Sequence, residues 1–316
     1  MLRLLALLAA SANPLHGGGP SGGVPVFPRR LDLFPSSAPG KNPFQGIPAL
    51  VGAGDDTFVA VIQDTVFDAR GTRLYSQLAA RTSTSGGASW SPEAPLPPFD
   101  RPAAQLKGFS SSNPGLIYDR HTDSVIVHFT LGTHGEINET VQVMSTARPF
   151  TTWSEPRSLT TQLAPGLPPG VIAWPGPGHG IQLQAGPFAG RLLMSGWFWD
   201  SSAHPRNGRQ NATVYYSDTH GESWRPTGVS LPCDESQLVE LNKPSPGSIA
   251  LYARHGQDNR SWPIPCLCQA VALSTTGGTS FGAVPWLPSV RFGGQAISYD
   301  PRKLQKTSNE SLEGRR

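Results

Sequence analysis

Four polar turns that each begin with serine recur along this chain and constrain its fold more than any other feature. They start at Ser83, Ser145, Ser217 and Ser274, which lie 62, 72 and 57 residues apart. In the clearest of them, a strand-forming run at 212–216 leads into a turn that closes on a tryptophan. A repeat of this length fits a four-stranded unit with a variable loop, and such a unit buries both faces only by stacking on its neighbours. The repeats therefore predict an all-β protein built from stacked blades.

The composition agrees with many short strands. The 316 residues include 35 glycines and 32 prolines, well above average usage, and no long window has an apolar period of 3.6 residues. The formal charge is only +3, and neither a block of like charges nor a basic stripe with aromatic residues is present. We therefore expect no nucleic-acid partner. Apart from the N-terminus, no apolar run is long enough for a transmembrane segment.

The N-terminal region predicts entry into the secretory pathway. Residues 1–12 combine an arginine, a leucine-rich run and a small-x-small end, as a short signal peptide does. The alternative is a disordered start that continues into the Gly/Pro/Ser-rich linker at 13–40. We expect one propeller domain at 41–300, a polar tail at 301–316, and a lysosomal or extracellular location. Four glycosylation sequons are compatible with that route, at Asn138, Asn211, Asn259 and Asn309.

Three cysteines limit the covalent and metal chemistry. Cys233, Cys266 and Cys268 allow at most one intrachain disulfide, and the spacing of the last two does not suit a zinc pair. No nearby cysteine or histidine set completes a site, so we expect structural or unpaired cysteines and no metal.

The turn at Ser217 resembles the Asp-box repeat of the sialidase (neuraminidase) family. That repeat reads roughly Ser-x-Asp-x-Gly-x-Ser/Thr-Trp, and here Thr219 occupies the aspartate position while Asp218 comes one place early. Further segments resemble those of the family in family order, notably Gly-Pro-Gly-His-Gly-Ile-Gln at 176–182 and Asp-Glu-Ser-Gln-Leu-Val-Glu-Leu at 234–241. The resemblance implies a six-bladed β-propeller that is incomplete here, with about four to five blades.

The resemblance also implies an activity and the residues that perform it. Sialic acid carries a carboxylate on its anomeric carbon, and the planar fork of an arginine meets a carboxylate with two parallel hydrogen bonds. Arg254 matches the second of three carboxylate-binding arginines in the family, and Glu235 matches the glutamate that activates its tyrosine nucleophile. The implied protein is an exo-α-sialidase without a cofactor, acting on sialylated glycoproteins, glycolipids such as gangliosides, or oligosaccharides.

Asp68 and Arg70 are the remaining candidates for site residues. They resemble the family's Glu/Asp-x-Arg segment, and Asp68 is also, with Asp64, the nearest candidate for the catalytic acid/base. Arg70 either lines the substrate pocket or pairs with Asp68, and the sequence leaves both alternatives open.

Several family positions differ in this chain. Gln45-Gly46 stands where the first arginine is expected, and the acid/base loop is shortened to Gly-Thr-Arg at 71–73, which has no carboxylate. The third arginine is not found. The nucleophilic tyrosine is not found either, since the surroundings of Tyr299, the last tyrosine, do not resemble the family's Gly-Tyr-Ser segment. The alternative function is therefore a catalytically impaired or inactive propeller that binds glycans or proteins.

Overall fold

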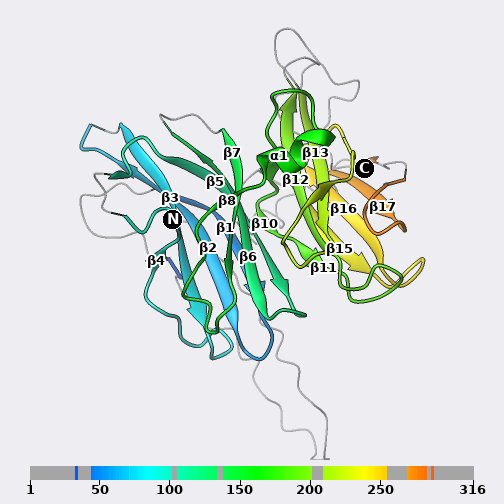
Figure 1. Cartoon of the computed structure of the whole chain (residues 1–316), viewed down its shortest axis with the longest axis horizontal. Coiled ribbons are helices and arrows are strands. Elements are labelled where there is room, and N and C mark those ends of the chain that lie inside the picture. The colour runs from blue at the N-terminus through cyan, green and yellow to red at the C-terminus, as the bar shows by residue number, and fades with distance from the viewer. Residues whose placement is uncertain are drawn as a thin grey trace, which may run out of the picture.

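The protein is all-β apart from two very short helical segments in the described part (Figure 1). The computed structural model describes residues 33–34, 44–70, 72–101, 105–133, 138–200, 209–254, 269–282 and 286–287. Several predictions lie outside these residues: the signal peptide, most of the linker, the tail, Cys266, Cys268, Tyr299, Asn259 and Asn309.

The first two sheets are built from successive antiparallel strands. The first sheet has the order β1 (Phe44–Gly52), β2 (Phe58–Phe67), β3 (Arg73–Ser83) and β4 (Ala94–Pro95). The second contains β5 (Ser110–Asp119), β6 (Ser124–Gly132), β7 (Glu139–Ser145) and β8 (Arg157–Ser158). The edge of this sheet next to β5 is completed by β10 (Gly178–His179), which comes from the next repeat and pairs parallel to β5.

The third and fourth sheets follow the same plan. The helical segments α1 (Thr160–Leu163) and η2 (Ala164–Gly166) connect β8 to the third sheet. That sheet has the order β11 (Ile181–Gln182), β12 (Leu192–Asp200), β13 (Arg209–Ser217) and β14 (Arg225–Pro226), and β9 (Trp174–Pro175) also pairs with β12. The fourth sheet has the order β15 (Ser236–Leu241), β16 (Ser248–Arg254), β17 (Gln269–Ser274) and β18 (Trp286–Leu287).

The hydrophobic core lies between neighbouring sheets. Successive side chains of a strand point to opposite faces of its sheet. Accordingly, Leu116 packs between the first and second sheets, whereas the next residue, Ile117, packs between the second and third. In the same way Leu192 faces the second sheet and Leu193 faces the fourth. Both faces of the central sheets are therefore buried, as the repeat predicted for stacked blades.

The turn at Ser217 shows why the aspartate position tolerates threonine. Ser217 Oγ accepts hydrogen bonds from the backbone N–H groups of Thr219 (3.1 Å) and Gly221 (2.9 Å). Thr219 Oγ1 in turn accepts the backbone N–H of Ser223 at 2.9 Å. A hydroxyl thus supplies the acceptor that closes the turn, which leaves Asp218 for other contacts. The same bonds recur in the turns at Ser83 and Ser274.

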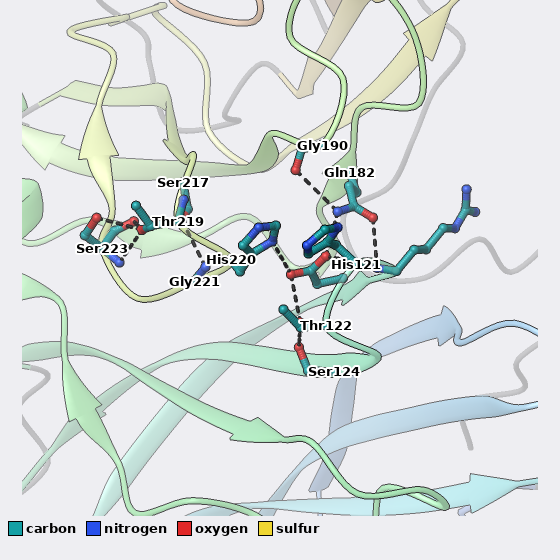
Figure 2. A network of polar contacts seen from close by, with 12 residues as sticks. His121, Thr122, Ser124, Gln182, Gly190, Ser217, Thr219, His220, Gly221 and Ser223 are labelled. Atoms are coloured by element: carbon teal, nitrogen blue, oxygen red, sulfur yellow. Dashed lines mark hydrogen bonds and ion pairs between the residues drawn. The ribbon is translucent and has the colours of Figure 1, made fainter.

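A polar network joins the second sheet to the third (Figure 2). Asp119, at the end of β5, has a fully buried side chain and accepts hydrogen bonds from Gln182 Nε2 (2.6 Å) and His220 Nδ1 (2.8 Å) of the third sheet. His220 also stacks on His121, with ring centroids 4.5 Å apart. Burial raises the pKa of the Asp119 carboxyl, but its hydrogen bonds outweigh that effect and hold the pKa below its ordinary value.

Equivalent contacts join the other neighbouring sheets. Arg148, which follows β7, donates from Nη2 to the carbonyl oxygen of Ala53 in the β1–β2 turn at 2.8 Å. Arg191, which precedes β12, donates from Nη1 to the carbonyl oxygen of Gly277 in the turn after β17 at 3.0 Å. In both contacts, the turn after the third strand of one sheet lies against the turn between the first two strands of the preceding sheet. These turns therefore gather at one end of the molecule, which we call the turn end.

Candidate active site

The fourth sheet brings Glu235 and Arg254 together. Ser236 at the start of β15 pairs with Ala253 near the end of β16, so the residues just beyond this pair face each other. The backbone N–H of Arg254 donates to the carbonyl oxygen of Glu235 at 2.8 Å, and Arg254 Nη2 lies 3.2 Å from Glu235 Oε2. The antiparallel pairing of β15 with β16 thus creates this contact.

A third residue, Asp234, forms an ion pair with the same guanidinium. It was not among the site residues predicted from the sequence. Its Oδ1 accepts Arg254 Nε at 2.9 Å and its Oδ2 accepts Nη2 at 2.7 Å. The side chain of Asp234 is 2% exposed, that of Arg254 31% and that of Glu235 27%. The only sequence signal was an acidic residue next to Glu235, which is too common a pattern to indicate a buried ion pair.

Burial dominates the electrostatics of this cluster. It raises the pKa of Glu235, the charge of Arg254 opposes the rise, and the charge of Asp234 adds to it. Burial likewise raises the pKa of Asp234 against the hydrogen bond and charge of Arg254. For Arg254, burial lowers the pKa, but the hydrogen bond to Asp234 and the two carboxylate charges leave it above its ordinary value. Arg254 therefore stays cationic. The carboxylate of Glu235 is a stronger base than that of an exposed glutamate, because Glu235 is partly buried.

Asp68 and Arg70 do not make the ion pair that was one of their two alternatives. Asp68 Oδ1 accepts the backbone N–H groups of Arg70 and Thr72, both at 2.8 Å, and so closes the turn after β2. The side chain of Arg70 is exposed. Among the described residues, neither side chain forms a hydrogen bond or ion pair with Glu235 or Arg254.

Strand direction nevertheless places Asp68 and Arg254 at the same end of the molecule. Asp68 follows β2 and Arg254 ends β16, the second strands of their sheets. The third strands, β3 and β17, run antiparallel to these and finish in the turns at Ser83 and Ser274. Because those turns lie at the turn end, Asp68 and Arg254 both lie at the opposite end, which we call the site end.

Asp64, the other candidate for the acid/base, lies in the interior of β2 rather than in a loop. It is buried and accepts a hydrogen bond from Gln77 Nε2 at 3.3 Å. In the β1–β2 register it faces Gln45, the residue at the position of the family's first arginine. A buried carboxylate inside a strand is poorly placed to protonate the leaving group of a glycan.

The described residues contain no group of three or more side chains suited to a metal ion. Among them, Cys233 is a buried free thiol, and burial together with the nearby Asp234 charge raises its pKa to about 12. The cysteine is therefore protonated at neutral pH and unsuited to nucleophilic chemistry. No helix in the described part has the length and apolarity needed to cross a membrane.

Comparison with known proteins gives a consistent picture. No family model matches the chain. The sequence is 29% identical to a sialidase of Micromonospora viridifaciens over 89% of this chain and 43% of that protein. It is 27% identical to sialidase-3 of Bos taurus, over 74% of this chain and 56% of the relative. The chain thus spans about half the length of these curated relatives.

Solved structures agree on the fold. The Hadza microbial sialidase Hz136 superposes with a TM-score of 0.56 at 20% identity, covering 79% of this chain and 47% of that one. The intramolecular trans-sialidase from Ruminococcus gnavus gives a TM-score of 0.55 at 17% identity, covering 77% of this chain and 71% of that one. The prediction of a sialidase-type β-propeller is confirmed.

Proposed function

We propose that this chain, which is a distant member of the sialidase family, recognises terminal sialic acids on glycoproteins, glycolipids such as gangliosides or oligosaccharides, and that its reaction is their hydrolysis. The observation that supports the proposal is the contact of 3.2 Å between Glu235 and Arg254 at the site end. The N-terminal sequence supports a lysosomal or extracellular setting for the activity.

The two residues have different roles in this proposal. Arg254 donates to the carboxylate of the sugar, because a guanidinium remains charged at any working pH and suits that geometry. Glu235 is the proton acceptor that activates a nucleophile. Burial raises the pKa of Glu235, which makes its carboxylate a better base than an exposed glutamate.

Binding without turnover is the second candidate, and a specific observation favours it. The carboxylate of Asp68 is engaged by two backbone N–H groups, and the loop at 71–73 carries no acid of its own. A glycosidase needs an acid close to the leaving oxygen, and losing one member of a catalytic set costs orders of magnitude in rate. This second candidate predicts that the 316-residue chain hydrolyses sialosides only at or near background.

The test measures turnover and binding side by side. Hydrolysis of a fluorogenic sialoside and ligand-observed NMR with a sialyl-oligosaccharide are compared for the wild type, Glu235→Gln, Arg254→Met and an exposed control, Glu139→Gln. Turnover that Glu235→Gln abolishes and Glu139→Gln leaves intact supports the hydrolase. Binding without turnover, weakened by Arg254→Met, supports the second candidate. The absence of both turnover and binding would refute the proposal.

A further inference from the structure

Asp234 holds the guanidinium of Arg254 more firmly than an exposed ion pair does. Two hydrogen bonds of 2.9 and 2.7 Å join its oxygens to Nε and Nη2 in the fork geometry that arginine and carboxylate favour. The backbone N–H of Asp234 also donates to the carbonyl oxygen of Arg254 at 2.9 Å. Because the Asp234 carboxylate is buried, it loses little to competition from water.

The ion pair with Asp234 determines which N–H groups of Arg254 are available to a ligand. Nε is bonded to Asp234, and Nη2 lies within reach of both Asp234 and Glu235. Nη1 makes no hydrogen bond to any other described residue, so its N–H groups are the donors that can meet an anion. The cluster also carries two carboxylates against one guanidinium.

We propose that Asp234 is a positioning residue for carboxylate recognition, which fixes Arg254 so that Nη1 faces the ligand. The inference rests on the proposed function, since it takes the ligand to be the carboxylate of a sialic acid. Positioning and simple charge predict opposite results. If Asp234 mattered only through its negative charge, neutralising it would strengthen the binding of an anion; if it positions Arg254, neutralising it weakens that binding.

The experiment uses Asp234→Asn in the full chain, with Asp218→Asn as the matched control. Asp218 makes the same two-bond contact with Arg191, at 2.8 and 2.9 Å, but lies at the turn end. The ligands are the methyl α-glycoside of N-acetylneuraminic acid and its uncharged methyl ester, measured by ligand-observed NMR. We expect Asp234→Asn to weaken binding of the acid by about 10-fold, the value of one charge-assisted hydrogen bond, and to leave binding of the ester unchanged. Asp218→Asn should change neither.

A second measurement does not depend on the ligand. Solvent exchange of the Arg254 Nε–H, followed by ¹⁵N NMR, should be slow in the wild type and fast in Asp234→Asn. Should that variant fail to fold, Arg254→Lys, which keeps the charge but loses the fork, should show the same loss of affinity for the acid.

The outcomes separate the two claims. Tighter or unchanged binding of the acid by Asp234→Asn overturns the positioning role, as does an Arg254 Nε–H that exchanges equally fast in both proteins. A wild type that binds neither ligand, but shows the difference in exchange, supports the positioning of Arg254 while it refutes the proposed function.

Discussion

The fully buried His128 predicts how the stability of this protein depends on pH. It lies on β6, with Nε2 3.0 Å from Gln142 Oε1 and Nδ1 3.2 Å from the hydroxyl of Tyr215. Gln142 Oε1 can only accept, and it also accepts Trp224 Nε1 at 2.7 Å. The proton of His128 is therefore on Nε2, and Nδ1 accepts from Tyr215, so the neutral ring satisfies both of its nitrogens.

Burial lowers the pKa of His128 from 6.5 to about 3; the hydrogen bond to Gln142 opposes that shift and the charge of Arg157 adds to it. Below pH 6.5 His128 becomes protonated in the unfolded chain, whereas in the folded protein it stays neutral down to about pH 3. The contribution of the neutral ring is thus complete above pH 6.5 and declines as the pH falls. One pKa unit corresponds to about 1.4 kcal/mol, so at pH 5 the free energy of unfolding should be lower by about 2 kcal/mol.

The assay is urea unfolding at pH 7.5 and pH 5.0 for the wild type and His128→Gln. The side-chain amide of the introduced glutamine can take the place of the ring nitrogen Nε2, and it does not become protonated in this pH range. The comparison uses the difference between the two pH values for each protein, so any constant loss of stability in the variant cancels. We expect the wild type to lose about 2 kcal/mol more than the variant on acidification. Equal losses in both proteins would refute the assignment of a neutral, buried His128.

Three further predictions test the packing, the turns and the secretory route. Gly180→Ala should lower the free energy of unfolding by about 1–3 kcal/mol, because a Cβ there would clash with the carbonyl oxygen of Leu193 in the neighbouring strand β12. The control is Gly282→Ala, where the atom nearest to an added Cβ is 3.6 Å away, and it should be close to neutral in the same urea titration. Thr219→Val should cost about 1 kcal/mol, since the Ser223 N–H loses its acceptor; an unchanged thermal midpoint would contradict the role given to that hydroxyl. Peptide mapping of protein secreted from mammalian cells should find a glycan on the exposed Asn138 and none on Asn211, which is 7% exposed within β13; a fully glycosylated Asn211 in folded protein would contradict this structure.

Local chemistry accounts for the part of the fold that the sequence determined. The serine-started turns close through hydrogen bonds between residues two to four positions apart, so their form can be inferred without knowing the rest of the molecule. The spacing of the turns then indicates the number of strands per repeat. Because successive side chains of a strand point to opposite faces of its sheet, stacking of the repeats buries both faces. The family resemblance assigned Glu235 and Arg254 to one site, and the antiparallel pairing of the consecutive strands β15 and β16 brings the two residues together.

Tertiary structure decided the features that depend on which segments become neighbours. β10 leaves its own repeat to pair with β5, and Asp119 collects donors from the third sheet, although nothing near either segment in the sequence indicates these contacts. The sequence made Asp68 a candidate catalytic residue, and only the structure shows that its Oδ1 also accepts two backbone N–H groups in the turn after β2. The buried carboxylate of Asp234 is compensated by Arg254 at the end of β16, because a carboxylate loses its hydration on burial and needs a partner, which here another strand supplies.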